Sequence, residues 1–273
     1  MQKFDFGQNW SDFSLSALTA ERTAQARMEF SRLMEHAMVD FKQKSFLDIG
    51  FGQGLSLLAA ASLGAYAVGC DINPKCGEVL ALNRARFPEL AERNIPVVIG
   101  SILDEATLAR LRVISPTGGT YDIVHSWGVL HHTGRMWAAV DQAADLVAPG
   151  GVLVLALYNR HWSSPFWKTV KRAYCAAPKW LQRVLIWLFY PVILVAKWLV
   201  TGRSPHAMER GMDFYYNVID WVGGYPYEYA RMDEVTGHLM RRGFVLQWQS
   251  PAKVPTGCNE QIFKSVDKEN CFV

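Results

Sequence analysis

The chain has 273 residues, half of them apolar and about a fifth charged, which is enough to bury one large core and excludes an intrinsically disordered chain. Its five cysteines are odd in number and include no C-x-x-C pair, which argues against both a disulfide framework and a zinc site. The net charge of +3 is unevenly placed, because residues 160–210 hold nine Lys and Arg against one acid.

The N-terminal residues 1–43 are expected to form a strap and a helix. Met1 to Asp5 lack a basic stretch that leads into an apolar run, so we expect no signal peptide and a cytoplasmic location. Residues 4–13 hold four aromatic side chains among turn formers without a clear period, which indicates a loop, either a packed strap or a lid over a cofactor. Residues 19–38 have apolar side chains at helical spacing and predict a half-buried helix.

The segment from Phe46 to Gly54 organises the chain, because an apolar run there ends in an acid and three glycines at every second position. It predicts a strand, a tight glycine loop and a helix whose N-terminus offers bare backbone to a ligand. The acid ahead of the loop disfavours a phosphate there and favours a cation. The dinucleotide fingerprint G-x-G-x-x-G fails, since its third glycine falls on Leu55 or Leu57, and this weakens an NAD oxidoreductase.

The remaining D-x-G-x-G-x-G pattern resembles the first motif of the class I S-adenosylmethionine-dependent methyltransferases. S-adenosylmethionine has no phosphate and carries an ammonium, a carboxylate and a sulfonium, which suits a carboxylate beside glycines. From the residues alone, a tight turn without a ligand stays open. The resemblance implies S-adenosylmethionine as the cofactor, bound by Asp48, Gly50, Gly52 and Gly54.

The next strands supply further candidates at their carboxyl ends, where ligands of open α/β sheets bind. Residues 66–71 predict a second strand ending in Asp71, which with Ile72 lies beside the glycine loop and is placed to accept hydrogen bonds from two ribose hydroxyls. Residues 97–104 predict a third strand. The resemblance implies that Asp104 after it takes the adenine amino group, while a helix N-cap is the plain alternative.

Residues 121–127 predict a fourth strand, whose Ser126 and Trp127 join the cofactor residues, followed by Val129-Leu130-His131-His132. This run resembles methyltransferases of ubiquinone and menaquinone biosynthesis, where it lines the cofactor near the transferred methyl group. The D/N-P-P-aromatic tetrad of enzymes that methylate amide or base nitrogens is absent, so nitrogen of that kind is disfavoured as the acceptor, and we predict oxygen as the acceptor atom. Of the two histidines, at most one is expected to face the acceptor; we choose His131 as the base and assign His132 to the substrate.

Beyond the fifth strand, residues 152–158, the pattern changes to basic, bulky apolar helices, and we expect residues 160–229 to be an insert that caps the substrate site. The apolar run of thirteen from Val184 to Ala196 is too short to span a bilayer. Two alternatives stay open, a buried cap and an interfacial element on anionic lipid whose Trp180, Trp187 and Trp198 lie at the headgroups.

A rigid aromatic loop near residues 220–229 offers further substrate contacts. The predicted substrate residues are Tyr158, Asn159, Tyr225 and Tyr227, and Glu228 is a second candidate base. Residues 232–242 predict a helix, and residues 244–249 and 261–266 a closing pair of strands joined by Gly257-Cys258-Asn259-Glu260. This joining segment belongs to a wider pattern that resembles a bacterial methyltransferase family. The other parts of the pattern are Phe6-Gly7-x-Asn9-Trp10, Tyr158-Asn159, Trp167-Lys168-x-x-Lys171-Arg172 and Asp220-Trp221-x-Gly223-Gly224-Tyr225-Pro226.

The predicted fold is α/β, a doubly wound, mostly parallel sheet of seven strands formed by residues 44–159 and 230–273, with the helical insert after strand five. The predicted function is a methyltransferase for a small-molecule or lipid-like acceptor. The alternative is a non-catalytic S-adenosylmethionine-binding protein that docks on a membrane or a partner through the insert. We expect no metal and no nucleic acid, leave a location at the inner membrane face open, and assign no oligomeric state.

Overall fold

The computed structural model describes residues 4–206 and 212–266 and contains one seven-stranded sheet in the order β3-β2-β1-β4-β5-β7-β6. Strands β1 to β5 are parallel, and β7 is antiparallel to both β5 and β6, which confirms the predicted fold. The strands are β1 Ser45–Ile49, β2 Tyr66–Asp71, β3 Val97–Ile99, β4 Tyr121–Trp127, β5 Val147–Tyr158, β6 Phe244–Ser250 and β7 Cys258–Ser265.

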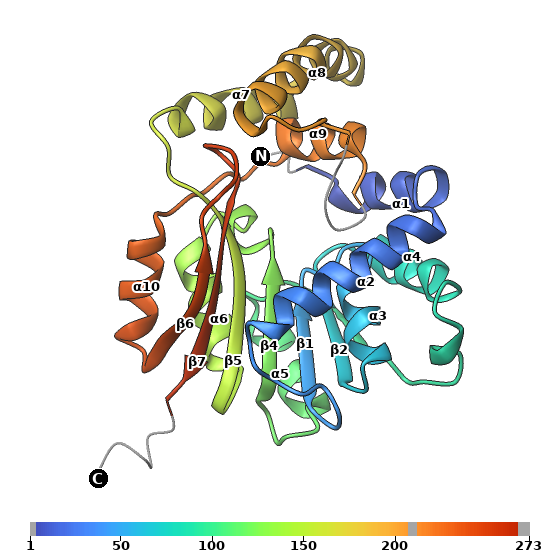
Figure 1. Cartoon of the computed structure of the whole chain (residues 1–273), viewed down its shortest axis with the longest axis vertical. Helices are drawn as coiled ribbons and strands as arrows, with labels where there is room; N and C mark the ends of the chain where they lie inside the picture. Colours follow the sequence, from blue (N-terminus) through green and yellow to red (C-terminus); the bar gives the residue numbers. More distant parts are fainter. Residues whose placement is uncertain (1–3, 207–211, 267–273) are drawn as a thin grey trace.

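Helices cover both faces of the sheet (Figure 1). On one face, α2 and α3 pack on the strands with α4 beside them and α1 against α4; on the other face lie α5, α6 and α10. Their bounds are α1 Phe6–Ser16, α2 Ala20–Glu35, α3 Leu55–Ser62, α4 Lys75–Arg84, α5 Glu105–Ile114, α6 Met136–Asp145 and α10 Met232–Met240. Short 3₁₀ turns, η1 Pro88–Leu90 and η2 Leu130–His132, contact α3 and α6, respectively.

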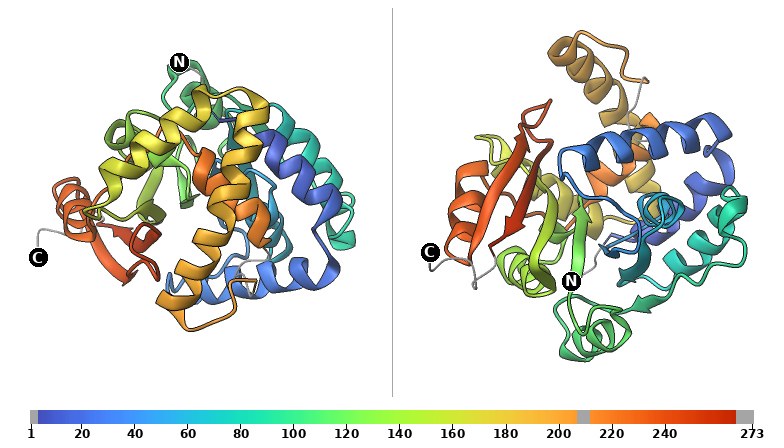
Figure 2. Two further views of the ribbon diagram at one scale, coloured as in Figure 1. Left: turned by 90° about the horizontal axis from the view of Figure 1, so that it is seen from above. Right: turned by 60° about the horizontal axis from the view of Figure 1, so that its bottom comes forward.

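The cap lies over the carboxyl ends of the parallel strands (Figures 1 and 2). It consists of α7 Ser164–Ala176, α8 Lys179–Thr201 and α9 Phe214–Gly223, which share an apolar cluster of their own. Ring contacts hold it together: Trp167 lies 4.2 Å from Trp221, and Tyr190 lies 5.1 Å from Phe214, between ring centroids. The cap therefore closes the sheet edge at which ligands of this fold class bind. The domain limits at residues 43, 159 and 229 stay predictions.

Two sequence predictions about the N-terminal and closing segments were wrong. Residues 6–16 form helix α1 and not a loop, because the Asp5 carboxylate accepts a hydrogen bond from the Gln8 backbone N–H at 3.1 Å and caps the first turn. The segment Cys258 to Glu260 lies within β7, paired with β5, and does not join the last two strands.

Helix α8 is longer than the apolar run from which we judged it. It has 23 residues, because the polar Gln182, Arg183 and Lys197 continue the helix on both sides of the run. By length and composition alone it is long and apolar enough to cross a membrane, which corrects the prediction that this segment is too short. The core helix of a soluble protein can have the same length and composition, so the contacts of α8 with the rest of the chain distinguish the two cases.

Candidate active site

The glycine loop between β1 and α3 is fixed by backbone conformation and close packing. Gly50, Gly52 and Gly54 all have positive φ, at 74°, 53° and 80°. A Cβ on Gly50 would lie 2.3 Å from a methyl of Val129, and one on Gly52 would lie 3.0 Å from Nε1 of Trp10. Only glycine meets both demands without strain. The loop therefore presents backbone to the cavity at the start of α3, and all but Gly54 of its glycines line that cavity.

The buried carboxylate behind the loop is held by a histidine from the neighbouring strand. Asp48 on β1 accepts a hydrogen bond from Nδ1 of His125 on β4 at 2.7 Å, and both side chains are almost fully buried. Because a carboxylate can only accept, Nδ1 of His125 carries the proton. Asp48 and His125 both line the cavity, so the acid predicted to favour a cation does lie at the ligand side of the loop.

Asp71 connects the end of β2 to the glycine loop. Its Oδ2 accepts from the backbone N–H of Gly52 at 3.0 Å, and its Oδ1 accepts from that of Asn73 at 2.9 Å. Burial raises the pKa of this carboxyl, and hydrogen bonds from the Asn73 and Gly52 backbone and from the Cys76 thiol act in the opposite direction. Asp71 and its neighbour Ile72 line the cavity at the predicted ribose position.

The two remaining strand ends differ from the prediction in detail. Strand β3 ends at Ile99, so Ser101 to Leu103 line the cavity and Asp104 does not. Asp104 begins α5 without a side-chain capping bond. On β4, Trp127 lines the cavity, whereas Ser126 is buried and donates to the Ile49 carbonyl at 3.0 Å.

The two adjacent histidines occupy different environments. His132 lines the cavity, and its Nδ1 lies 2.7 Å from the Pro226 carbonyl, which can only accept, so its Nε2 carries the free lone pair. Burial chiefly lowers the pKa of His132 to about 3. His131 is fully buried behind it, and its Nδ1 accepts from the Tyr158 backbone N–H at 3.2 Å. The structure thus brings His132, and not His131, to the cavity.

The other predicted substrate residues divide in the same way. Tyr158 and Tyr225 line the cavity, whereas Tyr227 is fully buried beneath it. Glu228 lies outside the lining residues, and its Oε2 accepts from the Met136 backbone N–H at the start of α6, at 3.0 Å. A carboxylate at this position stabilises the N-terminus of α6, so Glu228 has a structural role.

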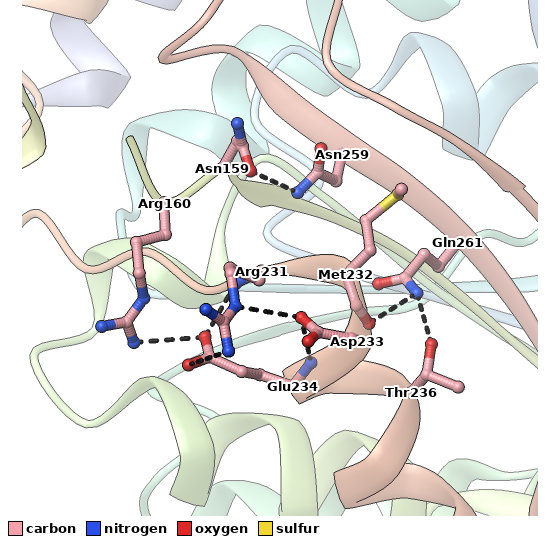
Figure 3. Close-up of polar contacts among 9 residues, drawn as sticks. All are labelled: Asn159, Arg160, Arg231, Met232, Asp233, Glu234, Thr236, Asn259 and Gln261. Carbon is pink, nitrogen blue, oxygen red and sulfur yellow. Dashed lines mark hydrogen bonds and ion pairs between the residues drawn. The ribbon is translucent and has the colours of Figure 1, made fainter. Parts of the chain in front are cut away.

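Asn159 lies in a structural network rather than in the cavity wall (Figure 3). Its Oδ1 accepts from Nδ2 of Asn259 at 3.1 Å, and its own Nδ2 donates to the Pro255 carbonyl at 3.0 Å. These bonds join the end of β5 to β7 and to the loop ahead of it. Below this pair, Arg160 and Arg231 bind Glu234 of α10 (Figure 3).

The cavity has a volume of about 1200 Å³ and extends from the glycine loop to the cap. Sites for one small ligand have about 300 to 1,000 Å³, so this cavity has room for a cofactor and an acceptor together. Its cap side holds residues that we had not assigned to the site, chiefly Asp220 and Trp221 of α9 and Trp167 of α7. The Asp220-Trp221 pair beside Gly223-Gly224 was the available sequence signal.

Comparison with known proteins identifies the family of the chain. Residues 19–215 match the model of the methyltransferase domain family, which is more than half of the chain. The chain belongs to this methyltransferase family. It is an enzyme that uses S-adenosylmethionine. The glycine loop with Asp48 and Asp71 fits that molecule, since bare backbone and carboxylate acceptors are the groups that would hold its ammonium and its ribose hydroxyls.

Among curated relatives, the methyltransferase is 29% identical over 177 residues to the "Ubiquinone biosynthesis O-methyltransferase" of Paraburkholderia xenovorans, covering 64% of this chain and 69% of that one. It is 33% identical over 133 residues to the protein of the same name from Burkholderia orbicola, covering 49% of this chain and 52% of the relative. The chain thus spans only about half the length of several of these relatives.

Among solved structures, the fold is similar to that of magnesium protoporphyrin IX methyltransferase from Synechocystis PCC 6803 with bound SAH, with a TM-score of 0.52 and 15% identity over 89% of this chain and 83% of that one. It is also similar to PKMT2 from Rickettsia typhi, with a TM-score of 0.56 and 12% identity over 91% of this chain and 54% of that one. These similarities concern the fold.

Proposed function

We propose that the enzyme transfers a methyl group from S-adenosylmethionine to an oxygen of a small or lipid-like acceptor. One observation carries this proposal: a single cavity joins the cofactor loop to an aromatic cap wall that includes His132, Tyr158 and Trp221. The names of the O-methyltransferase relatives support oxygen as the acceptor atom. A protein that only bound the cofactor would not need an acceptor space continuous with the cofactor loop.

The residues of this chain have chiefly to align two reactants and to exclude water. S-adenosylmethionine supplies, when bound, a sulfonium methyl group that is already activated for displacement. Asp71 would hold the ribose hydroxyls, and the backbone of Gly50 and Gly52 would support the amino acid end next to Asp48. Nε2 of His132 presents a lone pair to the cavity, where it would accept a hydrogen bond from a polar group of the acceptor other than the reacting hydroxyl.

We further propose that α8 rests on an anionic membrane surface. Trp180, Trp187 and Trp198 are 67%, 79% and 55% exposed. Spacings of 7 and 11 residues place all three within about 20° of one line along the helix. The surrounding segment 160–206 holds eight Lys and Arg and no Asp or Glu, and all of these cations but Lys171 reach the surface. Tryptophans with basic neighbours suit the headgroup region of anionic lipid.

The opposite side of α8 favours an interfacial position over a transmembrane one. Ile186 is buried, Tyr190 stacks edgewise on Phe214 of α9, and Ile193 and Lys197 line the cavity. A spanning helix would have to give up these contacts, whereas a helix lying on the surface keeps them. Since α8 forms part of the cavity wall, an acceptor dissolved in lipid would meet the cavity beside the membrane.

Methyl-labelled S-adenosylmethionine incubated with a cell extract and with its separated lipid fraction tests the proposed reaction. We expect label in an alkali-stable ether product, with calorimetry showing that both S-adenosylmethionine and its demethylated product bind. Cofactor binding without label in any metabolite or lipid would favour the non-catalytic alternative. Binding of neither molecule at millimolar concentration would overturn both.

Flotation with phosphatidylglycerol vesicles tests the membrane contact. We expect Trp187→Glu to lower vesicle partitioning at least about tenfold, because it places a charge in the apolar contact face. Val113→Glu is the matched control, since Val113 is equally exposed but lies on α5, away from the cap. Equal flotation of both variants, or full binding to neutral vesicles, would contradict an anionic docking surface.

A further inference from the structure

Three polar residues lie in or next to the cap side of the cavity, and none of them has a role in the proposed cofactor site. Asn9 of α1, Lys171 of α7 and Asp220 of α9 belong to separate segments of the sequence, yet they meet behind and beside the same aromatic wall. Asn9 and Lys171 are buried, and Asp220 lines the cavity. A buried polar group destabilises the fold unless it is paired, so the convergence of these three groups points to a functional role.

Lys171 is a fully buried cation enclosed by aromatic rings. Its Nζ lies 4.7 Å from the ring centroid of Trp221, 4.9 Å from that of Tyr227 and 5.6 Å from that of Tyr158. Within residues 4–206 and 212–266, this Nζ has no hydrogen-bond partner. Trp221 and Tyr158 line the cavity, so the ammonium lies directly behind the acceptor wall. Three ring faces favour a cation at that place.

Asp220 is the carboxylate on the cavity side of this cluster. Its Oδ1 accepts from Nδ2 of Asn9 at 2.7 Å, and the same Nδ2 also donates to the Tyr216 carbonyl at 3.2 Å. Helix α1 thus fixes the carboxylate orientation. In the part of the chain that the structure describes, no other side chain donates to Asp220, and it forms no direct ion pair with Lys171. One carboxylate oxygen is therefore available to a ligand.

Two groups could take a proton from the acceptor, Asp220 and His132, and their pKa values distinguish them. Burial raises the pKa of Asp220 to about 7, against the opposing effects of Asn9 and Lys171. His132 has its pKa lowered to about 3, so it can accept a hydrogen bond but cannot hold a proton near neutral pH. A base works best when its pKa lies near the working pH.

We infer that Asp220 accepts the hydroxyl proton of the acceptor and that Lys171, from behind the aromatic wall, stabilises the ionised form of Asp220. This inference rests on the proposed function. In the step, the acceptor oxygen forms a bond to the methyl carbon as the sulfur–carbon bond breaks, the sulfonium becomes a neutral thioether, and the hydroxyl proton goes to the Asp220 carboxylate. Asp220 then releases it to solvent through the cavity. Lys171 touches no reacting atom and has a positioning role.

The pH dependence of this step depends on every titratable group around the pair. Lys171 has its pKa lowered to about 7, chiefly by burial, with Asp220, Cys175 and Cys258 opposing that effect. The groups that face the pair come from α7, η2, β5, β7 and the loop before α10, and they are Cys175, His131, His132, Tyr158, Tyr227 and Cys258. Burial moves each of their pKa values toward the neutral form, so Lys171 and Asp220 are the pair that titrates near pH 7.

Carbon-13 NMR of protein labelled at the Asp carboxyl carbons tests the inference without a substrate. The difference between wild type and Asp220→Asn identifies the Asp220 signal. We expect it to titrate near pH 7, to move to higher pH in Lys171→Met, where the stabilising positive charge is lost, and to stay close to the wild-type midpoint in Lys171→Arg. A signal that titrates near pH 4, or one that Lys171→Met does not move, would overturn the inference.

Turnover gives the second measurement, on any acceptor found with labelled S-adenosylmethionine. We expect Asp220→Asn to lower kcat about 100-fold or more, with the dissociation constant of S-adenosylmethionine within about threefold of wild type, and Asp220→Glu to restore part of the loss. Wild-type kcat in Asp220→Asn would overturn the inference and leave the proposed function intact. A wild-type enzyme that labels no acceptor would refute the proposed function, while the NMR titration would still decide the charge pairing of Asp220 and Lys171.

Discussion

Replacing Lys171 by methionine should stabilise the enzyme while it impairs the acceptor site. Methionine has a similar length, carries no charge and packs well against aromatic rings such as Tyr158, Trp221 and Tyr227. The buried ammonium, in contrast, is held where burial lowers its pKa from 10.5 to about 7. A group whose charged form is disfavoured in the folded state reduces the free energy of unfolding wherever that group is charged in the unfolded chain.

The size of the effect follows from that pKa difference. At about 1.4 kcal/mol per pH unit, the penalty is about 5 kcal/mol at low pH and about 4 kcal/mol at pH 7. Cation–π contacts contribute about 0.5 to 1 kcal/mol each while the ammonium is charged, and near pH 7 it is only partly charged in the folded state, so the three ring contacts return about 1 kcal/mol there. We therefore expect Lys171→Met to raise the free energy of unfolding by about 3 kcal/mol at pH 7.

The sign of the pH dependence provides a sharper test than the size. Between pH 7 and 10.5 the unfolded chain binds the extra proton, so wild-type stability rises with pH and the advantage of Lys171→Met shrinks. By pH 9 the folded amine is neutral, so the ring contacts no longer act on a cation, and the remaining advantage of Lys171→Met should be about 2 kcal/mol. Urea unfolding at pH 7 and 9 measures both values.

Lys168→Met is the control, since Lys168 is exposed on the same helix and should change stability by less than about 0.5 kcal/mol. A Lys171→Met protein less stable than wild type at pH 7, or a difference that does not narrow at pH 9, would refute this reasoning.

Two further predictions concern the cofactor side. Asp71→Ala should weaken S-adenosylmethionine binding by about 1 to 3 kcal/mol in calorimetry, because it removes a charged acceptor. Asp104 lies outside the cavity lining, so Asp104→Ala should leave the dissociation constant within about threefold of wild type. Equal effects of the two substitutions would contradict this assignment. His125→Leu should lower the free energy of unfolding by about 3 kcal/mol or more, because it leaves the Asp48 carboxylate buried without its partner, and a loss below about 1 kcal/mol in urea unfolding would mean that Asp48 does not depend on His125.

The cofactor side could be predicted because a parallel sheet follows strict rules. Alternating strands and helices imply adjacent parallel strands, and the carboxyl ends of such strands meet at one edge. The prediction that Asp48 and Asp71 lie beside the same glycine loop needed only these rules, and the two side chains do line one cavity. The predicted bounds of β4 also match the structure, since turns with positive-φ glycines, Gly119 before the strand and Gly128 after it, delimit it.

The finer assignments could not be predicted, because they depend on partners far away in the sequence. Which of the two histidines faces the cavity is decided by the Pro226 carbonyl and the Tyr158 backbone N–H, 94 and 27 residues away. Asp104 follows a strand that ends earlier than its apolar pattern suggests, so the chain turns before the acid is reached. No local pattern encodes such contacts, and only the folded chain brings them together.

The cap shows where sequence patterns still help when periodicity does not. Helix α9 buries a regular stripe of Phe214, Val218 and Val222, but periodicity alone does not show that α7 and α9 meet through Trp167 and Trp221. In the folded chain the informative residues are those that break a burial rule, here a lysine and a carboxylate between tryptophans and tyrosines, because such residues lie in a core only at a cost in stability. Lys171 and Asp220 break that rule on two different helices, and a shared role beside the acceptor explains both with one cause, whereas separate structural roles would need two.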